Sequence, residues 1–325
     1  MKSFMKEVFK KAREAPGRIV FPESYDKRIL KAIPAIVKER IASPILLGKE
    51  KEVTKMMTNL GLSYDGVEII DHTTSEKLED YAKEFYDLRK TKGVTIEQAR
   101  ETVKKENYFG TMMVHMGDAD GMVYGALHPT ADTLLPAFQI IKTREPSHKA
   151  SGVFFIIFKD RPMLFADAAV QPDPSAEDLA NIAMDTAETA RRFGILPKVA
   201  MLSFSTKGSS KHPMAEKVIE ATRIVISREP SLIIDGELQL DAAIEPWVAE
   251  IKCPDSRIKG DANILIFPDL GAANIGYKLA TFFGKAEAIG PVLQGLNKPV
   301  NDLSRGCTVQ EIVNITAITV IEGHK

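Results

Sequence analysis

Short apolar runs alternate with amphipathic stretches along almost the whole chain. The runs at residues 18–22, 44–48 and 67–70 predict buried strands, and the stretches that follow them have the apolar spacing of helices. The same alternation returns in the second half, where the expected strands are residues 153–158, 163–168, 198–202, 232–234 and 263–267. Because parallel strands need a long crossover, this order predicts a doubly wound α/β architecture.

Capping chemistry marks the start of three helices. In each case a hydroxyl residue stands three positions before a Glu, Gln or Asp, so that side chain and backbone can cap each other. The pairs are Thr95 with Gln98, Ser175 with Asp178, and Thr308 with Glu311. A further helix is expected over about residues 130–142.

The polar segment 144–149 contains Pro146 and lies between two apolar stretches, which is typical of a crossing between domains. The length of 325 residues also favours two domains, at roughly 150 residues each.

Charge and cysteine usage exclude several classes of protein. The chain has 43 Lys and Arg against 44 Asp and Glu, a formal net charge of −1, and so lacks the basic excess that nucleic-acid binding requires. Cys253 and Cys307 form no C-x-x-C pair and the histidines lack metal-ligand spacing, so we expect no metal. No signal-peptide pattern and no run of about 20 apolar residues is present, which predicts a cytoplasmic protein without a membrane partner.

Three polar segments lie beside apolar ones. Residues 202–211 place hydroxyls, a glycine and two lysines after a predicted strand, as in a phosphate-binding loop, although an ordinary hydrophilic loop is the alternative. Residues 128–133 precede a predicted helix, and Thr130 suits either a helix cap or an anion site. Residues 290–308 are rich in Gly, Pro and Asn, and we interpret them as a functional segment rather than as packing.

The third segment contains the most specific chemistry. The planar guanidinium of Arg305 suits phosphate recognition, and Ser304 offers a hydroxyl beside it, although arginine on a surface loop is also common. Glu311 has two interpretations: it completes the capping box with Thr308, or it acts as a general base near Arg305.

Taken together, these segments closely resemble the phosphate acetyltransferases and the related phosphate butyryltransferases. The resemblance covers essentially the full chain with compatible spacing. It rests on residues 109–112, 130–133, 139–143, 202–209, 235–239, 259–263, 274–278 and 299–307.

The resemblance implies reversible acetyl transfer between acetyl phosphate and coenzyme A, giving acetyl-CoA and inorganic phosphate. It implies direct attack of the CoA thiolate without an acyl-enzyme, and no cofactor, since coenzyme A is a substrate. It also implies a homodimer. The fold it implies has two doubly wound α/β domains with a cleft between them, as in isocitrate and isopropylmalate dehydrogenases. The expected domains are residues 1–145 with 297–325, and residues 146–296.

The resemblance also implies roles for individual residues. Arg305 would bind the phosphoryl group, Ser304 would orient the thiol or stabilise the transition state, and Glu311 would take the thiol proton. A thiol of pKa ~8.5 is only slightly ionised at neutral pH, so a base helps it to react. Cys307 is not expected to be a nucleophile. The expected substrate-binding residues are Arg89, Thr130, Ser205, Thr206, Lys207, Asn274, Lys278 and Asn301.

Three positions depart from the family pattern. Glu311 stands where the family has Asp, Pro129 where it has Ser, and Leu135 where it has a cleft Arg, whereas Arg89 matches the family's other cleft Arg. Leu135 and Pro129 leave open a CoA-binding paralogue with weakened catalysis. A phosphate butyryltransferase with a longer acyl substrate is a further alternative. A dehydrogenase of the related fold is the last alternative, and it would need a divalent metal site for which we find no acidic cluster in the sequence. One methylene is worth only ~1–3 kcal/mol in a pocket, so the sequence does not choose the acyl chain.

Overall fold

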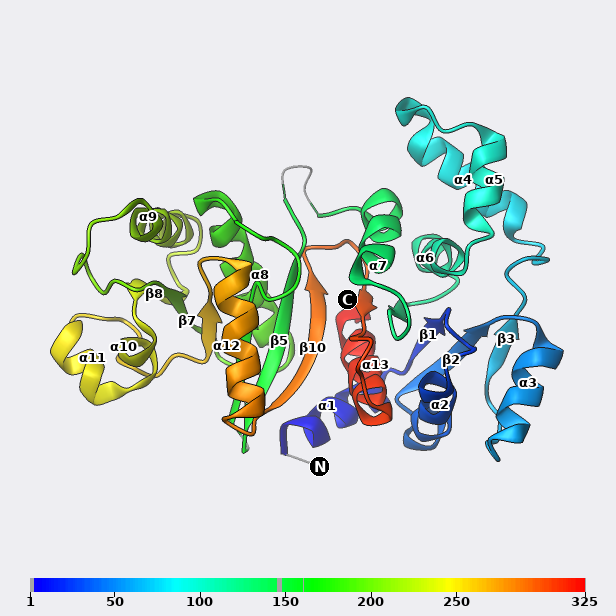
Figure 1. Cartoon of the computed structure of the whole chain (residues 1–325), viewed down its shortest axis with the longest axis horizontal. Helices are drawn as coiled ribbons and strands as arrows, with labels where there is room; N and C mark the ends of the chain where they lie inside the picture. The colour runs from blue at the N-terminus through cyan, green and yellow to red at the C-terminus, as the bar shows by residue number, and fades with distance from the viewer. Residues whose placement is uncertain (1–2, 145–147, 160, 325) are drawn as a thin grey trace. The chain divides into compact units, whose positions relative to one another are not determined.

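The computed structural model describes residues 3–144, 148–159 and 161–324. These residues form two compact units (Figure 1). Unit 1 comprises residues 3–144 and 296–324, and unit 2 comprises residues 148–159 and 161–295. Residues 145–147 of the predicted crossing at 144–149 lie outside the described residues. The last part of the chain therefore belongs to the same unit as the first.

Within the described part of unit 1, five strands form one sheet in the order β11-β4-β1-β2-β3, and each pairing in it is parallel. The strands are β1 (Gly17–Phe21), β2 (Ala42–Leu47), β3 (Glu68–Ile70), β4 (Gly121–Tyr124) and β11 (Val300–Asp302). The helices are α1 (Ser3–Glu14), α2 (Lys27–Glu39), α3 (Glu50–Asn59), α4 (Leu78–Arg89), α5 (Ile96–Val103), α6 (Glu106–Met116), α7 (Thr130–Pro136) and α13 (Val309–Gly323).

Helices cover both faces of this sheet, as neighbouring residues of β4 show. Successive strand residues point to opposite faces. A Cβ at Gly121 would meet Thr319 of α13, whereas Met122 contacts Thr111 of α6 on the other face. Small residues at such positions let helix and strand approach closely.

Unit 2 is built on a mixed sheet. Among its described residues, six strands follow the order β10-β5-β6-β9-β7-β8. Strand β5 pairs antiparallel with β10 and β6, and the remaining pairs are parallel. The strands are β5 (Ser151–Phe158), β6 (Arg161–Ala166), β7 (Lys198–Leu202), β8 (Ile233–Leu238), β9 (Ile264–Ile266) and β10 (Glu287–Gln294).

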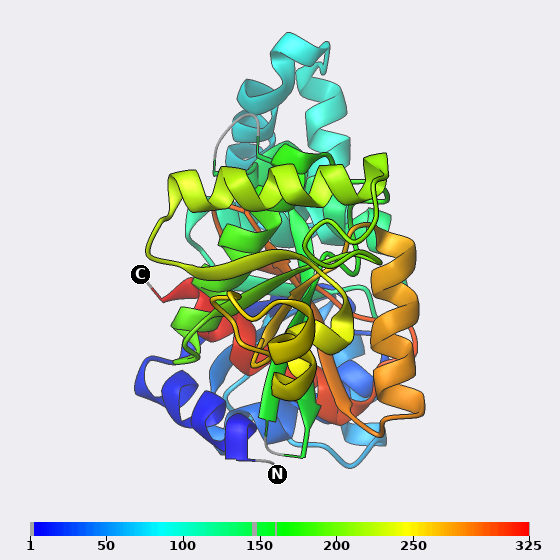
Figure 2. The same ribbon diagram turned by 90° about the vertical axis from the view of Figure 1, so that its left-hand side faces the viewer.

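The helices of unit 2 again lie on both faces of the sheet. Phe154 of β5 stacks on Tyr277 of α12, with ring centroids 4.4 Å apart, whereas the adjacent Phe155 packs edge-on against Phe193 at the end of α8. Figure 2 shows this unit from the side that carries α9 to α12. The helices are α8 (Ala176–Arg192), α9 (Pro213–Arg228), α10 (Leu240–Ile244), α11 (Pro246–Lys252) and α12 (Leu270–Phe282).

The structure confirms the predicted doubly wound α/β class and all three predicted capping boxes, at Thr95, Ser175 and Thr308. The helix expected over 130–142 is interrupted: α7 ends at Pro136, and a short π-helical segment, Ala137–Ile141, follows. The interpretation of residues 290–308 as lacking packing is wrong in part. Strands β10 and β11 run through this segment, and Val292, Leu293 and Val300 are buried.

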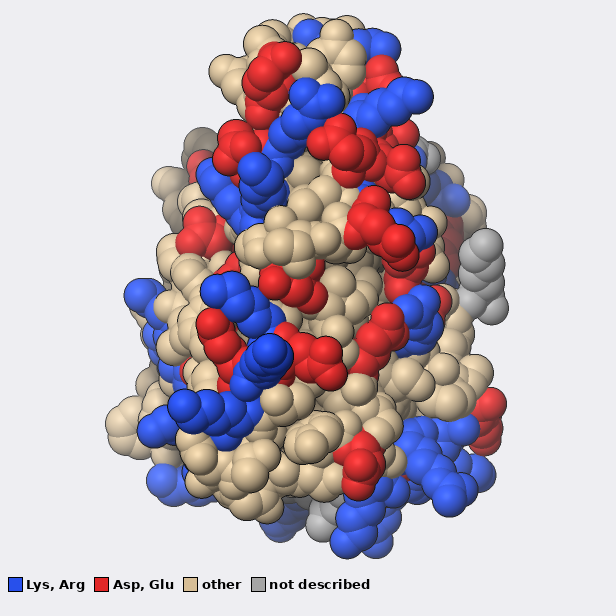
Figure 3. All heavy atoms as spheres, turned by 90° about the vertical axis from the view of Figure 1, so that its right-hand side faces the viewer, with Lys and Arg blue, Asp and Glu red and all other residues tan. Residues whose placement is uncertain are grey.

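No helix in the described part of the chain is both long and apolar enough to cross a membrane. Acidic and basic side chains are interspersed over the face of unit 1 that carries α3, α4 and α5 (Figure 3). That pattern agrees with the near-zero net charge of the whole chain.

Candidate active site

The polar segments of unit 1 meet at the carboxyl ends of the strands in its sheet. Strands β11, β4 and β1 are neighbours and parallel, so the loops that follow Asp302, Tyr124 and Phe21 leave the sheet side by side. In open α/β sheets, ligands bind beyond the carboxyl ends of the strands. The site is therefore built from three loops that are far apart in the sequence.

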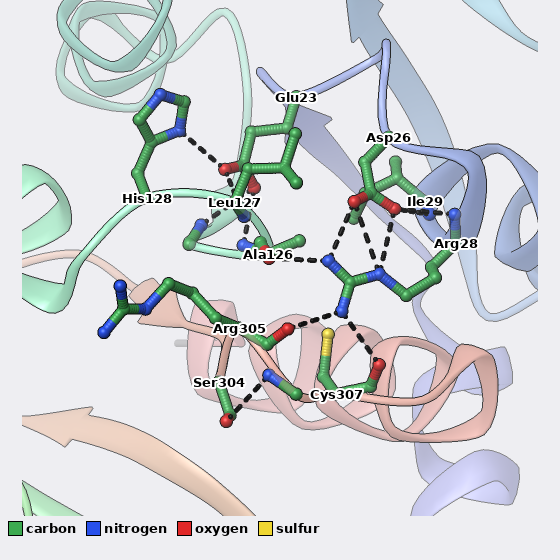
Figure 4. Close-up of polar contacts among 12 residues, drawn as sticks. Glu23, Asp26, Arg28, Ile29, Ala126, Leu127, His128, Ser304, Arg305 and Cys307 are labelled. Carbon is green, nitrogen blue, oxygen red and sulfur yellow. Dashed lines mark hydrogen bonds and ion pairs between the residues drawn. The ribbon is translucent and has the colours of Figure 1, made fainter.

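A buried carboxylate fixes the loop after β4. Glu23, with 1% of its surface exposed, accepts hydrogen bonds from the backbone N–H groups of Gly125 (3.0 Å), Ala126 (2.7 Å) and Leu127 (2.9 Å). His128 Nδ1 lies 2.8 Å from the same carboxylate, and because an ionised carboxylate only accepts, His128 donates from Nδ1 (Figure 4). Four donors thus share one acidic side chain.

The loop after β4 also lies very close to the loop after β11. Gly125 has a φ of +102°, and a Cβ there would overlap the Asp302 carboxylate and lie 3.0 Å from the backbone nitrogen of Leu303. Only glycine permits this approach without displacing a neighbour.

Arg28 connects the same loops from the first turn of α2. Its Nη1 donates to the carbonyl oxygens of Arg305 (2.7 Å) and Cys307 (3.2 Å), and its Nη2 donates to the carbonyl oxygen of Ala126 (2.6 Å). Asp26 pairs with the guanidinium at 2.8 Å (Figure 4). Burial alone would raise the pKa of Asp26, but hydrogen bonds and charge from Arg28 hold it below its ordinary value.

Asp302 holds the start of α7. Its carboxylate accepts from the Thr130 hydroxyl at 2.7 Å and from the Thr133 hydroxyl. Burial raises the pKa of Asp302 to about 6, and the two hydroxyl bonds oppose that rise. Thr130 is thereby tied to the strand that leads into Ser304 and Arg305.

Ser304 and Arg305 are exposed in the loop after β11. Among the described residues, nothing forms a hydrogen bond or ion pair with the Arg305 guanidinium, which extends away from the loop backbone in Figure 4. The Ser304 hydroxyl accepts from the Gly306 N–H at 3.2 Å. An unpaired guanidinium on a fixed backbone is suited to binding an anion.

Glu311 caps α13. Its Oε2 accepts from the Thr308 backbone N–H at 2.6 Å, and the Thr308 hydroxyl accepts from the Glu311 backbone N–H at 3.2 Å. The cap uses one carboxylate oxygen. The capping interpretation is therefore correct for this structure, and Oε1 is left for other contacts.

Cys307 is buried below the same loop. Burial raises the pKa of its thiol to about 11, and nearby Glu311 adds to the rise while Arg28 opposes it. The thiol is therefore protonated at neutral pH and is a weak nucleophile.

Arg89 and Asn301 differ in what surrounds them. Arg89 ends α4, and its Nε is buried without a hydrogen-bond partner among the described residues. Asn301 is fully buried on β11 and donates to Thr319 at 2.9 Å and to Glu322 at 2.6 Å, both on α13. Because Asn301 and Asp302 face opposite sides of the sheet, we assign Asn301 to the packing of α13 rather than to substrate contact.

In unit 2, the loop after β7 wraps around the carboxylate of Glu237, which belongs to β8. Glu237 Oε1 accepts from the Ser205 hydroxyl at 2.9 Å and from the Gly208 N–H at 2.8 Å. Lys207 forms an ion pair with Asp235. The groups expected to hold a phosphate thus hold side chains of unit 2 in this structure.

The other predicted residues of unit 2 lie in the loop after β7 and on α12. The buried Thr206 accepts from the Gln239 N–H at 2.9 Å. Asn274 and Lys278 lie one turn apart on α12, with the Lys278 ammonium 5.9 Å from the ring centre of Tyr277. No group of three His, Cys, Asp or Glu that could hold a metal ion occurs in the described residues.

Sequence reasoning missed Glu23, Asp26, Arg28 and Asp302. Glu23 directly follows the first predicted strand, and a charged residue at the carboxyl end of a buried strand was the available signal. Arg28 lies in an amphipathic helix, where an arginine ordinarily indicates a solvated face, so its sequence context carried no signal.

Comparison with known proteins agrees over nearly the whole chain. The model of a family described as phosphate acetyl/butaryl transferase matches residues 3–320. The phosphate acetyltransferase of Bacillus subtilis is 51% identical over 305 residues, which cover 94% of each chain. The structure of the EutD phosphotransacetylase from Staphylococcus aureus superposes with a TM-score of 0.93 at 45% identity, covering 99% of this chain and 98% of that one.

One relative is much longer. The phosphate acetyltransferase of Nitratidesulfovibrio vulgaris is 50% identical over 323 residues, which are 99% of this chain and 46% of the relative. The chain thus spans about half of that protein.

Proposed function

Because the chain belongs to the phosphate acetyl/butaryl transferase family, as its sequence predicted, we propose that it transfers an acetyl group reversibly between acetyl phosphate and coenzyme A. The observation that carries the proposal is the unpaired, exposed Arg305 guanidinium beside Ser304, on a loop whose backbone Arg28 holds. An anionic phosphoryl group is the partner that such a guanidinium lacks.

The proposed reaction is a direct displacement at the acetyl carbonyl. The CoA sulfur attacks the carbonyl carbon, a C–S bond forms, and the bond from that carbon to the phosphate oxygen breaks. The thiol proton passes to a base, and the electrons of the broken bond leave with inorganic phosphate. Reversal regenerates acetyl phosphate and the thiol.

We assign Arg305 and Ser304 to the reacting groups. Arg305 holds the phosphoryl group and stabilises the negative charge that grows on the leaving phosphate. The Ser304 hydroxyl orients the thiol or donates to the tetrahedral oxyanion. Both residues are exposed, which leaves them accessible to substrates.

We propose that Glu311 accepts the thiol proton through Oε1, the oxygen that the cap does not use. The N-terminus of α13 stabilises its negative charge. A thiol of pKa ~8.5 gains reactivity from such a base at neutral pH.

The proposal requires no acyl-enzyme. The Cys307 thiol is buried, and its pKa of about 11 keeps it protonated, which supports a direct transfer to CoA. We expect that enzyme incubated with radiolabelled acetyl phosphate alone retains no label after denaturation.

We propose that the remaining predicted residues, apart from Asn301, contribute to substrate binding within their own units. In unit 1, Arg89 has an unpaired buried Nε, and Thr130 is held in place by Asp302. In unit 2, Lys278 on α12 supplies positive charge that suits the phosphates of CoA, and Asn274 lies one turn before it. Lys207 offers a second ammonium, which Asp235 shares in this structure. Ser205 and Thr206 shape the loop that carries Lys207.

The experiment is CoA-dependent release of phosphate from acetyl phosphate by the purified chain. We expect turnover by the wild type and a loss of about 100-fold or more in kcat/KM for Arg305→Ala, because removal of one such donor costs several kcal/mol in the transition state. Arg18→Ala is a matched control, since Arg18 pairs with Glu68 on the surface. An inactive wild type contradicts the proposal. The same assay with butyryl phosphate shows which acyl chain length the protein prefers.

Leu135 motivates a second candidate, a CoA-binding paralogue with weakened catalysis. Its side chain is 51% exposed on α7, at a position where the family resemblance predicts an arginine. Pro129, just before α7, likewise supplies no side-chain cap. Binding of CoA without turnover supports this candidate, and recovery of activity in Leu135→Arg identifies the missing cation as the cause.

We further propose a homodimer in the cytoplasm that needs no cofactor. Cys253 and Cys307 are free thiols, which suits a reducing compartment. Displacement of phosphate by a thiolate moves no electrons to or from an external carrier. The support for a dimer is an apolar face at α12 on which Ile275, Leu279, Phe282 and Phe283 are exposed.

A further inference from the structure

Arg28 makes more long-range contacts than a helix-surface arginine needs. It lies in the first turn of α2, and its guanidinium reaches one backbone carbonyl after β4 and two after β11. The three oxygens belong to Ala126, Arg305 and Cys307 (Figure 4). A planar fork with five donors can serve three acceptors and a carboxylate at once.

Asp26 completes the arrangement. It is buried, it accepts from Nε (3.2 Å) and Nη2 (2.8 Å) of Arg28, and it also caps α2 by accepting from the Arg28 backbone N–H at 2.6 Å. The carboxylate therefore neutralises and orients the guanidinium. The remaining N–H groups are left for the carbonyl oxygens.

The segment that Arg28 holds has little else to fix it. Among the described residues, the other hydrogen bonds of residues 304–306 are local: Gly306 N–H to the Ser304 hydroxyl, and Cys307 N–H to the Ser304 carbonyl at 2.8 Å. Leu303, directly before this segment, donates its N–H to the carbonyl oxygen of Tyr124 at 2.7 Å. Among the described residues, the bonds from Arg28 are the ones that join the segment after that anchor to the loop after β4 and to α2.

We propose that Arg28 is a positioning residue for the transfer reaction: it sets the backbone of residues 305–307 so that the Arg305 side chain meets the substrate phosphoryl group. This inference rests on the proposed function. Arg28 acts through Arg305, with its own donors occupied by the protein. Misplacement of a catalytic group by about 1 Å can cost 10²-fold in rate, so the orientation of this loop has a direct effect on turnover.

The test compares Arg28→Lys with Arg13→Lys. Lysine keeps the charge but lacks the fork that joins three carbonyls. Arg13 is a matched control because its Nε also donates to a backbone carbonyl, that of Glu39, at 2.8 Å, on the surface of unit 1. We expect kcat/KM for acetyl phosphate to fall about 10- to 100-fold in Arg28→Lys and by less than about twofold in Arg13→Lys.

Two further measurements separate positioning from general stability. In Arg28→Lys, the KM for acetyl phosphate should rise while the KM for CoA changes little, and amide exchange should accelerate in the peptide that contains residues 303–308. In Arg28→Ala, guanidinium ions at concentrations that do not unfold the protein should restore part of the activity. If Arg28→Ala does not fold, Arg28→Lys and its amide exchange decide the question.

Each failure has its own signature. An active wild type with an equally active Arg28→Lys contradicts the role of Arg28 and leaves the proposed function intact. A uniform loss of stability, with both KM values unchanged and no faster exchange at residues 303–308, contradicts it too. A wild type without turnover contradicts the proposed function itself.

Discussion

Glu311 combines two roles that one substitution separates. Glutamine at this position keeps an oxygen that can accept from the Thr308 N–H, so Glu311→Gln retains the capping box and removes only the basic carboxylate. We expect its thermal midpoint to stay within about 2 °C of the wild type, while kcat at pH 7 falls by about 10²-fold or more. Thr308→Ala is the control, because it weakens the cap and spares the carboxylate. Unchanged kcat in Glu311→Gln would limit Glu311 to the cap.

Asp302 predicts a pH dependence of stability. The pKa of the Asp302 carboxyl is about 6 in the folded chain and 3.8 as its ordinary value. Between pH 3.8 and pH 6, the folded chain therefore keeps the carboxyl protonated whereas the unfolded chain loses the proton. The resulting stabilisation is complete below about pH 3 and is lost progressively as the pH rises from there through 6. Relative to Asp302→Asn, wild-type unfolding free energy should fall by about 3 kcal/mol between pH 3 and pH 7.

The measurement is chemical denaturation of both proteins across this pH range, followed by far-ultraviolet circular dichroism, which reports the unfolding of both units. Asp65→Asn is the control, since Asp65 is exposed and bonds only locally to Ser63. A constant difference between wild type and Asp302→Asn would show that burial of this carboxyl does not perturb its titration.

At the scale of the element, the loop after β7 depends on Glu237. Its carboxylate accepts from a buried serine hydroxyl and from the backbone of Gly208. In Glu237→Ala both donors lose their acceptor, at about 1–3 kcal/mol each, whereas Glu237→Gln keeps an oxygen at the same place. We expect limited proteolysis near residue 208 to accelerate strongly in the alanine variant and only slightly in the glutamine variant. Equal rates in both variants would mean that the loop is ordered by other contacts.

Elements with a clear pattern could be predicted from the sequence, and short or interrupted ones could not. Capping boxes and apolar runs are local signals, so the three boxes and most strands were predicted. Strand β10 was missed because Gly290 and Pro291 interrupt its apolar pattern, where the pairing with β5 is also irregular. Strand β11 has three residues, which is too short to reveal that Asn301 and Asp302 face opposite sides.

For the site, too, the sequence predicts local features but not contacts between distant residues. Ser304 and Arg305 were found because they follow one another in a recognisable motif. Arg28 is 277 positions from Arg305, and Glu23 is more than 100 positions from the loop that it holds. Such partners are brought together only by the order of strands in the sheet. A single sequence does not state that order.

For the whole molecule, a net charge of −1 gives no overall attraction for anionic substrates. Binding must then depend on local cations such as Arg305 and Arg89, whose donors are unpaired among the described residues. Screening at physiological ionic strength acts over about 8 Å, so these groups act at short range. The exposed Leu135 leaves this set one cation short of the family pattern.

The apolar face of α12 predicts how two copies associate. Ile275, Leu279, Phe282 and Phe283 share one side of the helix, and the two phenylalanines are 69% and 82% exposed. An exposed apolar cluster of this kind is typical of an interface, and burial of each ring in a dimer would contribute about 1.5–3 kcal/mol. We expect Phe282→Lys to raise the dimer dissociation constant at least about tenfold, measured by analytical ultracentrifugation.

Leu196→Lys is the control, because Leu196 is 67% exposed in unit 2 but lies outside α12, between α8 and β7. A wild type that sediments as a monomer at all concentrations contradicts the dimer, and a dimer equally stable in Phe282→Lys and Leu196→Lys places its interface elsewhere.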